Sequence, residues 1–178
     1  MPKAHHLFTI TRGLLRLATG FCFFLIVLLA LALGALELAL LGLVHLPIPE
    51  SEMHGAPTAQ ILAAATLAIT GGVICIALAA WMFILTARII DTASTGDPFV
   101  TQNADRLNHI ACLLLVIQVV GLTVDALINL FPKNITDHVS IGYDGISASG
   151  VLAALLIFVL AQIFRRGSEM RAELEGTV

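Results

Sequence analysis

Charged and aromatic residues are both scarce in this chain. Only 12% of its 178 residues are charged and 6% are aromatic, with a single tryptophan and a single tyrosine. Soluble domains carry about 25% charged residues. Here 58% of the residues are hydrophobic and the mean hydropathy is +0.98, which excludes an ordinary water-soluble domain because one core could not bury so many apolar side chains. The net charge of −3 is also too small to indicate direct nucleic-acid binding.

Sequence signatures of catalysis and metal binding are lacking as well. No HExxH, CxxC, GxSxG or P-loop motif occurs, and the histidines form no metal-binding pattern, since two are adjacent near the N-terminus and the other four are scattered along the chain. Cys22, Cys75 and Cys112 all fall within apolar stretches, which argues against a structural disulfide framework. We therefore expect no enzyme activity, no bound metal and no cofactor.

Long apolar stretches are what the chain has instead. They cover residues 14–46, 59–85, 107–131 and 146–164, and each is long enough for a membrane-spanning helix, which needs about 20 residues. The stretches are continuous and do not alternate, so they predict helices and not barrel strands. The first is too long for a cleavable signal peptide. The sequence predicts an all-α, four-helix transmembrane bundle, forming a single membrane domain of residues 1–178 with a tail at 165–178.

The distribution of basic residues predicts the orientation. One side of the predicted membrane domain carries eight of the nine basic residues, and only Lys133 lies on the other side. Positive residues stay cytoplasmic because the membrane potential and the anionic inner leaflet resist their translocation. We therefore expect a multi-pass protein of a bacterial inner (cytoplasmic) membrane with both termini inside. The eight residues are Lys3, Arg12, Arg16, Arg88, Arg106, Arg165, Arg166 and Arg171.

Two of the apolar stretches are longer than a bilayer requires. The first extends outward by residues 37–46 and the second by residues 59–65, so their outer apolar side chains need cover. The loop at residues 132–145, with Val139, Ile141 and Tyr143, could supply it, as could a second subunit in a homo-oligomer. In the second stretch, Ala64, Ala68 and Gly72 form a ridge of small residues that favours helix packing within the bundle.

The polar middle loop and the tail predict a docking surface. Phe99 is an apolar residue within the polar loop at 91–106, and Phe164, Gly167, Met170 and Leu174 recur at helical spacing in the tail. We expect Phe99 to pack near Phe164 or Gly167, and Arg165 to pair weakly with Glu169 one turn further. The candidate partner-docking residues are Phe99, Arg165, Arg166, Met170, Arg171 and Leu174.

Two segments resemble a known family. The loop GDPFVTQNADRL and the fourth span with its tail, VLAALLIFVLAQIFRRGSEMRAELEGTV, are similar to a bacterial family of small four-helix membrane proteins catalogued as domain of unknown function 2975. Its members are often encoded beside a small helix-turn-helix repressor-like protein. The resemblance therefore implies a membrane-bound regulatory partner, and it carries over no catalytic residue.

Glu37 and Asp125 are the only acids within the apolar stretches. An ionisable group at the centre of a membrane helix costs ~2.5–3.5 kcal/mol, which makes it a candidate functional group. With His45 and Asn129 these acids form a candidate polar cluster near the outer leaflet, which could carry a proton or hold a metal. The alternative interpretation is that both acids mark the outer membrane interface. Trp81 has a similar interfacial explanation at the cytoplasmic end of the second stretch.

The predicted function follows from these patterns. We expect an integral membrane protein without catalysis of its own, acting as a membrane-embedded regulator or anchor of a cytoplasmic partner such as a small DNA-binding regulator. The alternative is a small transporter or proton-coupled pore. That function would need a continuous polar path through the bundle, for which the polar residues of the third stretch, Gln118 among them, are candidates; their simpler role is hydrogen bonding between helices.

Overall fold

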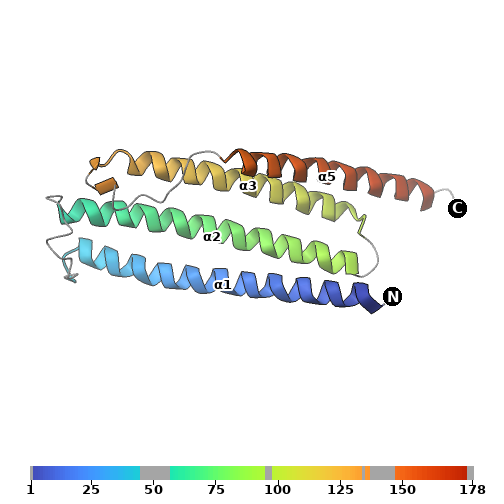
Figure 1. The fold of residues 1–178 in the computed structure, drawn as a ribbon, viewed down its shortest axis with the longest axis horizontal. Helices are drawn as coiled ribbons and strands as arrows, with labels where there is room; N and C mark the ends of the chain where they lie inside the picture. Colours follow the sequence, from blue (N-terminus) through green and yellow to red (C-terminus); the bar gives the residue numbers. More distant parts are fainter. Residues whose placement is uncertain (1, 45–56, 95–97, 134, 137–146, 176–178) are drawn as a thin grey trace. The chain divides into compact units, whose positions relative to one another are not determined.

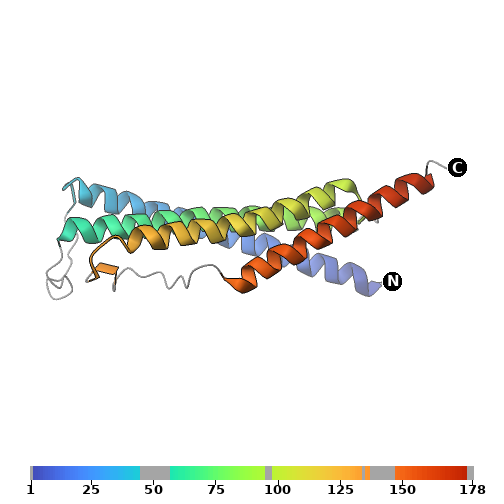
Figure 2. The same ribbon diagram turned by 90° about the horizontal axis from the view of Figure 1, so that it is seen from above.

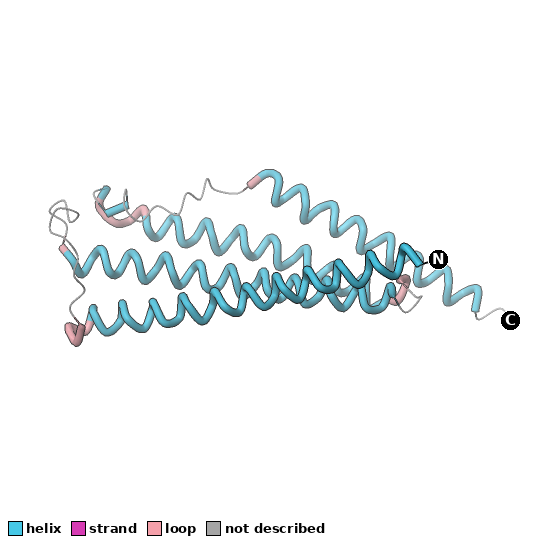
Figure 3. The backbone as a smooth tube through the Cα atoms, turned by 60° about the horizontal axis from the view of Figure 1, so that its bottom comes forward, coloured by secondary structure: helices cyan, strands magenta, loops and turns pink. Residues whose placement is uncertain are grey.

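A computed structural model describes residues 2–44, 57–94, 98–133, 135–136 and 147–175, with residues 2–8 and 175 described as backbone only. Four long helices make up almost all of the described chain, and the described loop residues form only short stretches (Figures 1 and 3). Each helix is long and apolar enough to cross a membrane. The all-α, four-helix prediction is confirmed. The helices are α1 (Pro2–Leu40), α2 (Thr58–Ser94), α3 (Thr101–Ile128) and α5 (Ala148–Glu175).

The first helix is overlong, as predicted, but compared with the apolar stretch at 14–46 it begins earlier at its N-terminus and ends earlier at its C-terminus. It contains 39 residues, about 58 Å at 1.5 Å per residue. It ends at Leu40, six residues before the predicted boundary, because Gly42 adopts a φ of 71°. The N–H of Leu43 then donates to the carbonyl of Leu38 at 2.9 Å, and that of Gly42 to Ala39 at 3.0 Å. These bonds form a Schellman motif, which stops a helix whatever the hydropathy of the following residues.

The connection between the second and third helices is much shorter than the predicted loop at 91–106. Helix α2 continues to Ser94 and α3 already begins at Thr101. The prediction was wrong here because hydropathy marks the part of a helix that suits lipid, whereas a helix also continues into polar sequence.

The last helix runs without a break from Ala148 to Glu175 (Figure 2). Its first turn is capped by Ser147, whose Oγ accepts a hydrogen bond from the N–H of Gly150 at 3.3 Å. The predicted extension of the fourth helix beyond Phe164 into the tail is therefore confirmed.

The chain divides into two compact units, and each helix from α1 to α3 contributes to both. Unit 1 comprises Met1–Cys22, Leu78–Val116 and Ser147–Val178, and unit 2 comprises Phe23–Ala77 and Ile117–Ile146. All eight basic residues that the sequence assigned to one side belong to unit 1, and Lys133 belongs to unit 2.

In unit 2, α2 and α3 approach closely at a glycine. A Cβ atom built on Gly71 would lie 2.5 Å from Cγ2 of Val124, whereas one on Gly72 would meet nothing within 4 Å. The predicted ridge of small residues is therefore displaced: Ala64 is fully buried, but Gly71 and not Gly72 makes the close approach. The prediction erred because two adjacent glycines point 100° apart on a helix.

The segment after α3 covers the N-terminal end of α2. Ile135 and Ala64 are both fully buried against each other, with Ile61 and Phe131 packed around them. The loop at 132–145 thus supplies cover through Ile135. Val139, Ile141 and Tyr143, the residues expected to do so, lie outside the described residues.

In unit 1, α1 is attached to α2 by a polar contact. The Arg12 guanidinium forms an ion pair with Asp91 at 2.6 Å and donates a hydrogen bond to Ser94 Oγ at 3.1 Å. Of the α1 side chains that the structure describes, Cys22 alone is buried. The exposed apolar side chains of α1 are suited to contact with lipid.

Candidate functional site

Phe99 occupies the position predicted for it. Its ring lies 5.3 Å from the Phe164 ring, centroid to centroid, at an interplanar angle of 38°. It also lies against Gly167, where a Cβ atom would be only 2.8 Å from Phe99 Cδ1. Gly167 is therefore needed for the close approach of the aromatic ring to the helix. The contact joins the α2–α3 connection to α5 and confirms the predicted packing.

A buried asparagine, which sequence reasoning missed, holds this connection in place. Asn103 has no exposed surface. Its Nδ2 donates to Thr92 Oγ1 at 2.8 Å and to the Pro98 carbonyl at 3.0 Å. Its Oδ1 accepts a hydrogen bond from Arg106 Nη1 at 2.8 Å. One side chain thus ties the end of α2, the loop before Phe99 and the first turns of α3 together, which fixes where Phe99 lies.

The Arg165 side chain holds α5 against α3. Its Nη2 lies 2.8 Å from Asp105 Oδ1, and both side chains are about half exposed, at 45% and 53%. The expected pairing of Arg165 with Glu169 was wrong, because a carboxylate on the neighbouring helix is within reach. Thr101 Oγ1 adds a weak hydrogen bond to Ser168 Oγ at 3.4 Å. These contacts fix the face of α5 that carries Arg165 and Ser168.

The opposite face of the same helix segment is exposed and apolar. Residues follow one another by about 100° around a helix, so Ile163, Met170 and Leu174 lie together, roughly opposite Arg165 and Ser168. Their exposed fractions are 56%, 60% and 71%. We call these three residues the tail stripe. Arg166 borders the stripe and is exposed, with no hydrogen bond or ion pair in the described part of the chain.

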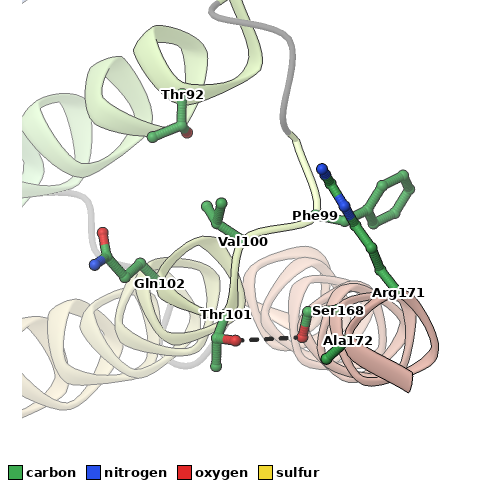
Figure 4. Close-up of a pocket in the computed structure, with 8 residues that line it drawn as sticks. All are labelled: Thr92, Phe99, Val100, Thr101, Gln102, Ser168, Arg171 and Ala172. Carbon is green, nitrogen blue, oxygen red and sulfur yellow. Dashed lines mark hydrogen bonds between the residues drawn. The ribbon is translucent and has the colours of Figure 1, made fainter. Parts of the chain in front are cut away.

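A surface pocket of about 400 Å³ lies beside Phe99 (Figure 4). Arg171 reaches from α5 along the Phe99 ring, and Thr101 and Ser168 line the pocket between α3 and α5. The predicted docking residues Phe99 and Arg171 are thus brought together. Phe99 itself remains 43% exposed, so its outer edge is accessible.

The candidate polar cluster of Glu37, Asp125, Asn129 and His45 is assembled only in part. Asn129 Nδ2 donates to Asp125 Oδ2 at 3.1 Å, one turn apart on the chain. Glu37 is exposed, and within the described residues no hydrogen bond or ion pair joins it to Asp125. His45 lies outside the described residues. Where the chain is described, no group of three or more His, Cys, Asp and Glu side chains is placed to hold a metal.

The polar path required by a transporter stays a prediction. Gln118 is buried, with 9% of its surface exposed, and it has a bonding partner, as expected for a residue that joins helices. Neither Gln118 nor Asp125 lines the pocket beside Phe99.

These features define an integral membrane protein with four helices and a structured polar end. The chain belongs to the family described as protein of unknown function (DUF2975), whose model matches residues 45–178. This membership confirms the resemblance seen in the loop and tail segments. No curated protein and no solved structure matches the chain.

Proposed function

We propose that this membrane protein anchors or regulates a cytoplasmic protein, which docks on the end of α5. The observation that carries the proposal is the tail stripe: Met170 and Leu174 are 60% and 71% exposed on a helix whose opposite face is fixed to α3 by Arg165.

The part of α5 that carries Met170 and Leu174 is unsuited to lipid. Residues 165–175 extend for about 16 Å and include three arginines and three glutamates. Large apolar side chains exposed in such a polar segment favour protein contact, since burying one is worth about 1.5–3 kcal/mol. An apolar centre holds a partner, and charged residues around it set the orientation and the rate of association.

The distribution of basic residues supports a cytoplasmic location for this surface. Unit 1 contains eight of the nine basic residues, and positive residues remain on the cytoplasmic side. The genes beside those of similar proteins indicate which partner to test first, namely a small helix-turn-helix regulator. Bound at the membrane, such a regulator would be kept from DNA until released.

Affinity purification from native membranes tests the docking surface. The tagged parent chain is expected to recover one or more cytoplasmic proteins, and Leu174→Glu should reduce their recovery at least about tenfold, since it places a charge in the apolar contact. Thr177→Glu adds the same charge at the end of the chain and should not. Equal recovery by the parent and Leu174→Glu chains would exclude the tail stripe as the docking surface.

Cysteine labelling tests the orientation separately. In a chain whose three native cysteines are replaced, cysteines at Ser51 and Asn134 should react with an impermeant reagent in intact cells. Cysteines at Ser94 and Thr177 should react only after the membrane is opened. Reaction at Ser94 in intact cells would overturn the proposed topology.

A further inference from the structure

A second surface pocket lies between α2 and α3 in unit 1. It has a volume of about 320 Å³, which is at the lower end of the range of roughly 300–1,000 Å³ for ligand sites. On α2 it is lined by Trp81, Leu85 and Arg88, which share one helix face because they are four and three residues apart. The α3 wall includes Arg106, so the two helices bring two arginines to one pocket.

One of these two cations is held in place and the other is unpaired. Arg106 Nη1 donates to the Arg88 carbonyl at 3.1 Å and to Asn103 Oδ1 at 2.8 Å, so the buried Asn103 orients the Arg106 guanidinium. The Arg88 side chain has no hydrogen bond or ion pair within the described residues. An arginine fork that has no protein partner is suited to binding a phosphate.

The acidic residue at the pocket does not cancel this charge. Asp105 lines the pocket on α3, but its carboxylate is already paired with Arg165 at 2.8 Å. His109, also on α3, adds a ring whose Nδ1 lies 2.7 Å from the Asp105 carbonyl. A carbonyl only accepts hydrogen bonds, so Nδ1 carries the proton there. The pocket therefore keeps a positive balance that favours an anion.

The part of the pocket wall formed by Trp81 indicates that the anion belongs to a lipid. Trp81 is seven residues before Arg88, about 10 Å along the helix toward the apolar section of α2, and 62% of its surface is exposed. Tryptophan is enriched at the level of lipid headgroups, where its ring meets both acyl chain and water. Beside it, Leu85 is buried and closes the pocket floor.

We propose that the pocket formed by Trp81, Arg88 and Arg106 binds the phosphate of an anionic phospholipid. The two guanidinium groups hold the phosphate, and the acyl chains run along Trp81. Basic pockets between membrane helices at the cytoplasmic side are suited to such headgroups. The lipid would also bridge α2 and α3 near the α2–α3 connection that positions Phe99.

Native mass spectrometry of the full chain in neutral detergent tests this site. Phosphatidylglycerol is expected to bind more tightly than phosphatidylcholine with the same acyl chains, because both carry the phosphate but only the former is a net anion. Arg88→Gln should weaken phosphatidylglycerol binding at least about tenfold, the loss expected for a charge-assisted hydrogen bond. Arg88→Lys keeps the charge and should retain most of the binding, which separates loss of charge from misfolding.

The matched control is Arg16→Gln. Arg16 is exposed and unpaired in the described chain, is not part of the pocket wall, and loses the same unit of charge. Its phosphatidylglycerol binding should stay within about twofold of the parent. Equal losses for Arg16→Gln and Arg88→Gln would overturn the site, because they would show attraction to the overall charge alone. So would equal binding of the two lipids.

The source of the phosphate is tested with Trp81→Ala and with inorganic phosphate. Trp81→Ala should weaken phosphatidylglycerol binding, and inorganic phosphate should not displace the lipid at equal concentration, because it lacks the acyl chains that contact Trp81. Displacement by inorganic phosphate would show that the pocket takes a soluble phosphate and would refute the lipid proposal. Unchanged lipid binding by Trp81→Ala would also overturn the proposed site, because it would show that the acyl chains do not contact Trp81.

Discussion

Replacing Gly71 by alanine tests the close contact between α2 and α3 in unit 2. The new Cβ atom would lie 2.5 Å from Cγ2, 3.1 Å from Cγ1 and 3.3 Å from Cβ of Val124. Both methyl groups of Val124 are in the way, and a valine in a helix holds one side-chain rotamer. The two helices must therefore move apart. Overpacking of this kind costs about 1–3 kcal/mol, so Gly71→Ala should be less stable by that amount than a Gly→Ala change on the same helix that meets no neighbour.

The neighbouring glycine provides the control. A Cβ atom at Gly72 would meet nothing within 4 Å, and the gain in helix propensity, about 1 kcal/mol, applies to both positions. Thermal unfolding in one detergent should rank the variants with Gly71→Ala clearly below Gly72→Ala. Adding Val124→Ala to Gly71→Ala should recover part of the loss. Equal unfolding temperatures for the two single variants would refute the close contact.

Three further substitutions test other parts of the structure. Asn103→Ala should lower the free energy of unfolding by about 1–3 kcal/mol, because buried partners lose their hydrogen bonds; an unchanged denaturation midpoint would contradict this. Asp105→Asn should cost at most about 1 kcal/mol, because its pair with Arg165 is half exposed, and the loss should shrink at high salt. Gly42→Ala should cost about 1–2 kcal/mol at a φ of 71°, unlike Gly34→Ala within the helix; similar unfolding temperatures would argue against the Schellman motif.

The number and type of the helices could be predicted from hydropathy, but their ends could not. Hydropathy measures how well a segment suits lipid, so it finds the apolar part of each helix. It does not detect Gly42, where backbone geometry ends α1 within a run of leucines. Nor does it detect that α2 continues to Ser94, where the residues are polar and the helix has left the apolar section.

The packing of Phe99 could be predicted because two unusual features had to meet. An apolar ring in a polar loop needs to be covered by other apolar groups. Gly167 has no side chain and leaves space among the apolar residues that recur at helical spacing in the tail, so the ring can pack there. Asn103 carried no such signal, since an asparagine in a polar loop is ordinary until its complete burial is seen. The pair of Arg165 with Asp105 joins residues far apart in sequence, and spacing alone favours a partner one turn away.

The arginines show most clearly what the structure adds to the sequence. Counted along the chain they form one class and indicate orientation, since the bilayer responds to each positive charge alike. The structure separates those that hold helices together, such as Arg165 with Asp105, from those without a partner among the described residues, Arg88 and Arg166 among them. A charge already paired within the protein contributes little to binding, whereas an unpaired one at a pocket or beside an apolar stripe is available to a ligand. Arg88 lines the pocket that carries Trp81, and Arg166 borders the tail stripe. Mutagenesis for function should therefore begin with these two residues, before the arginines that hold the fold.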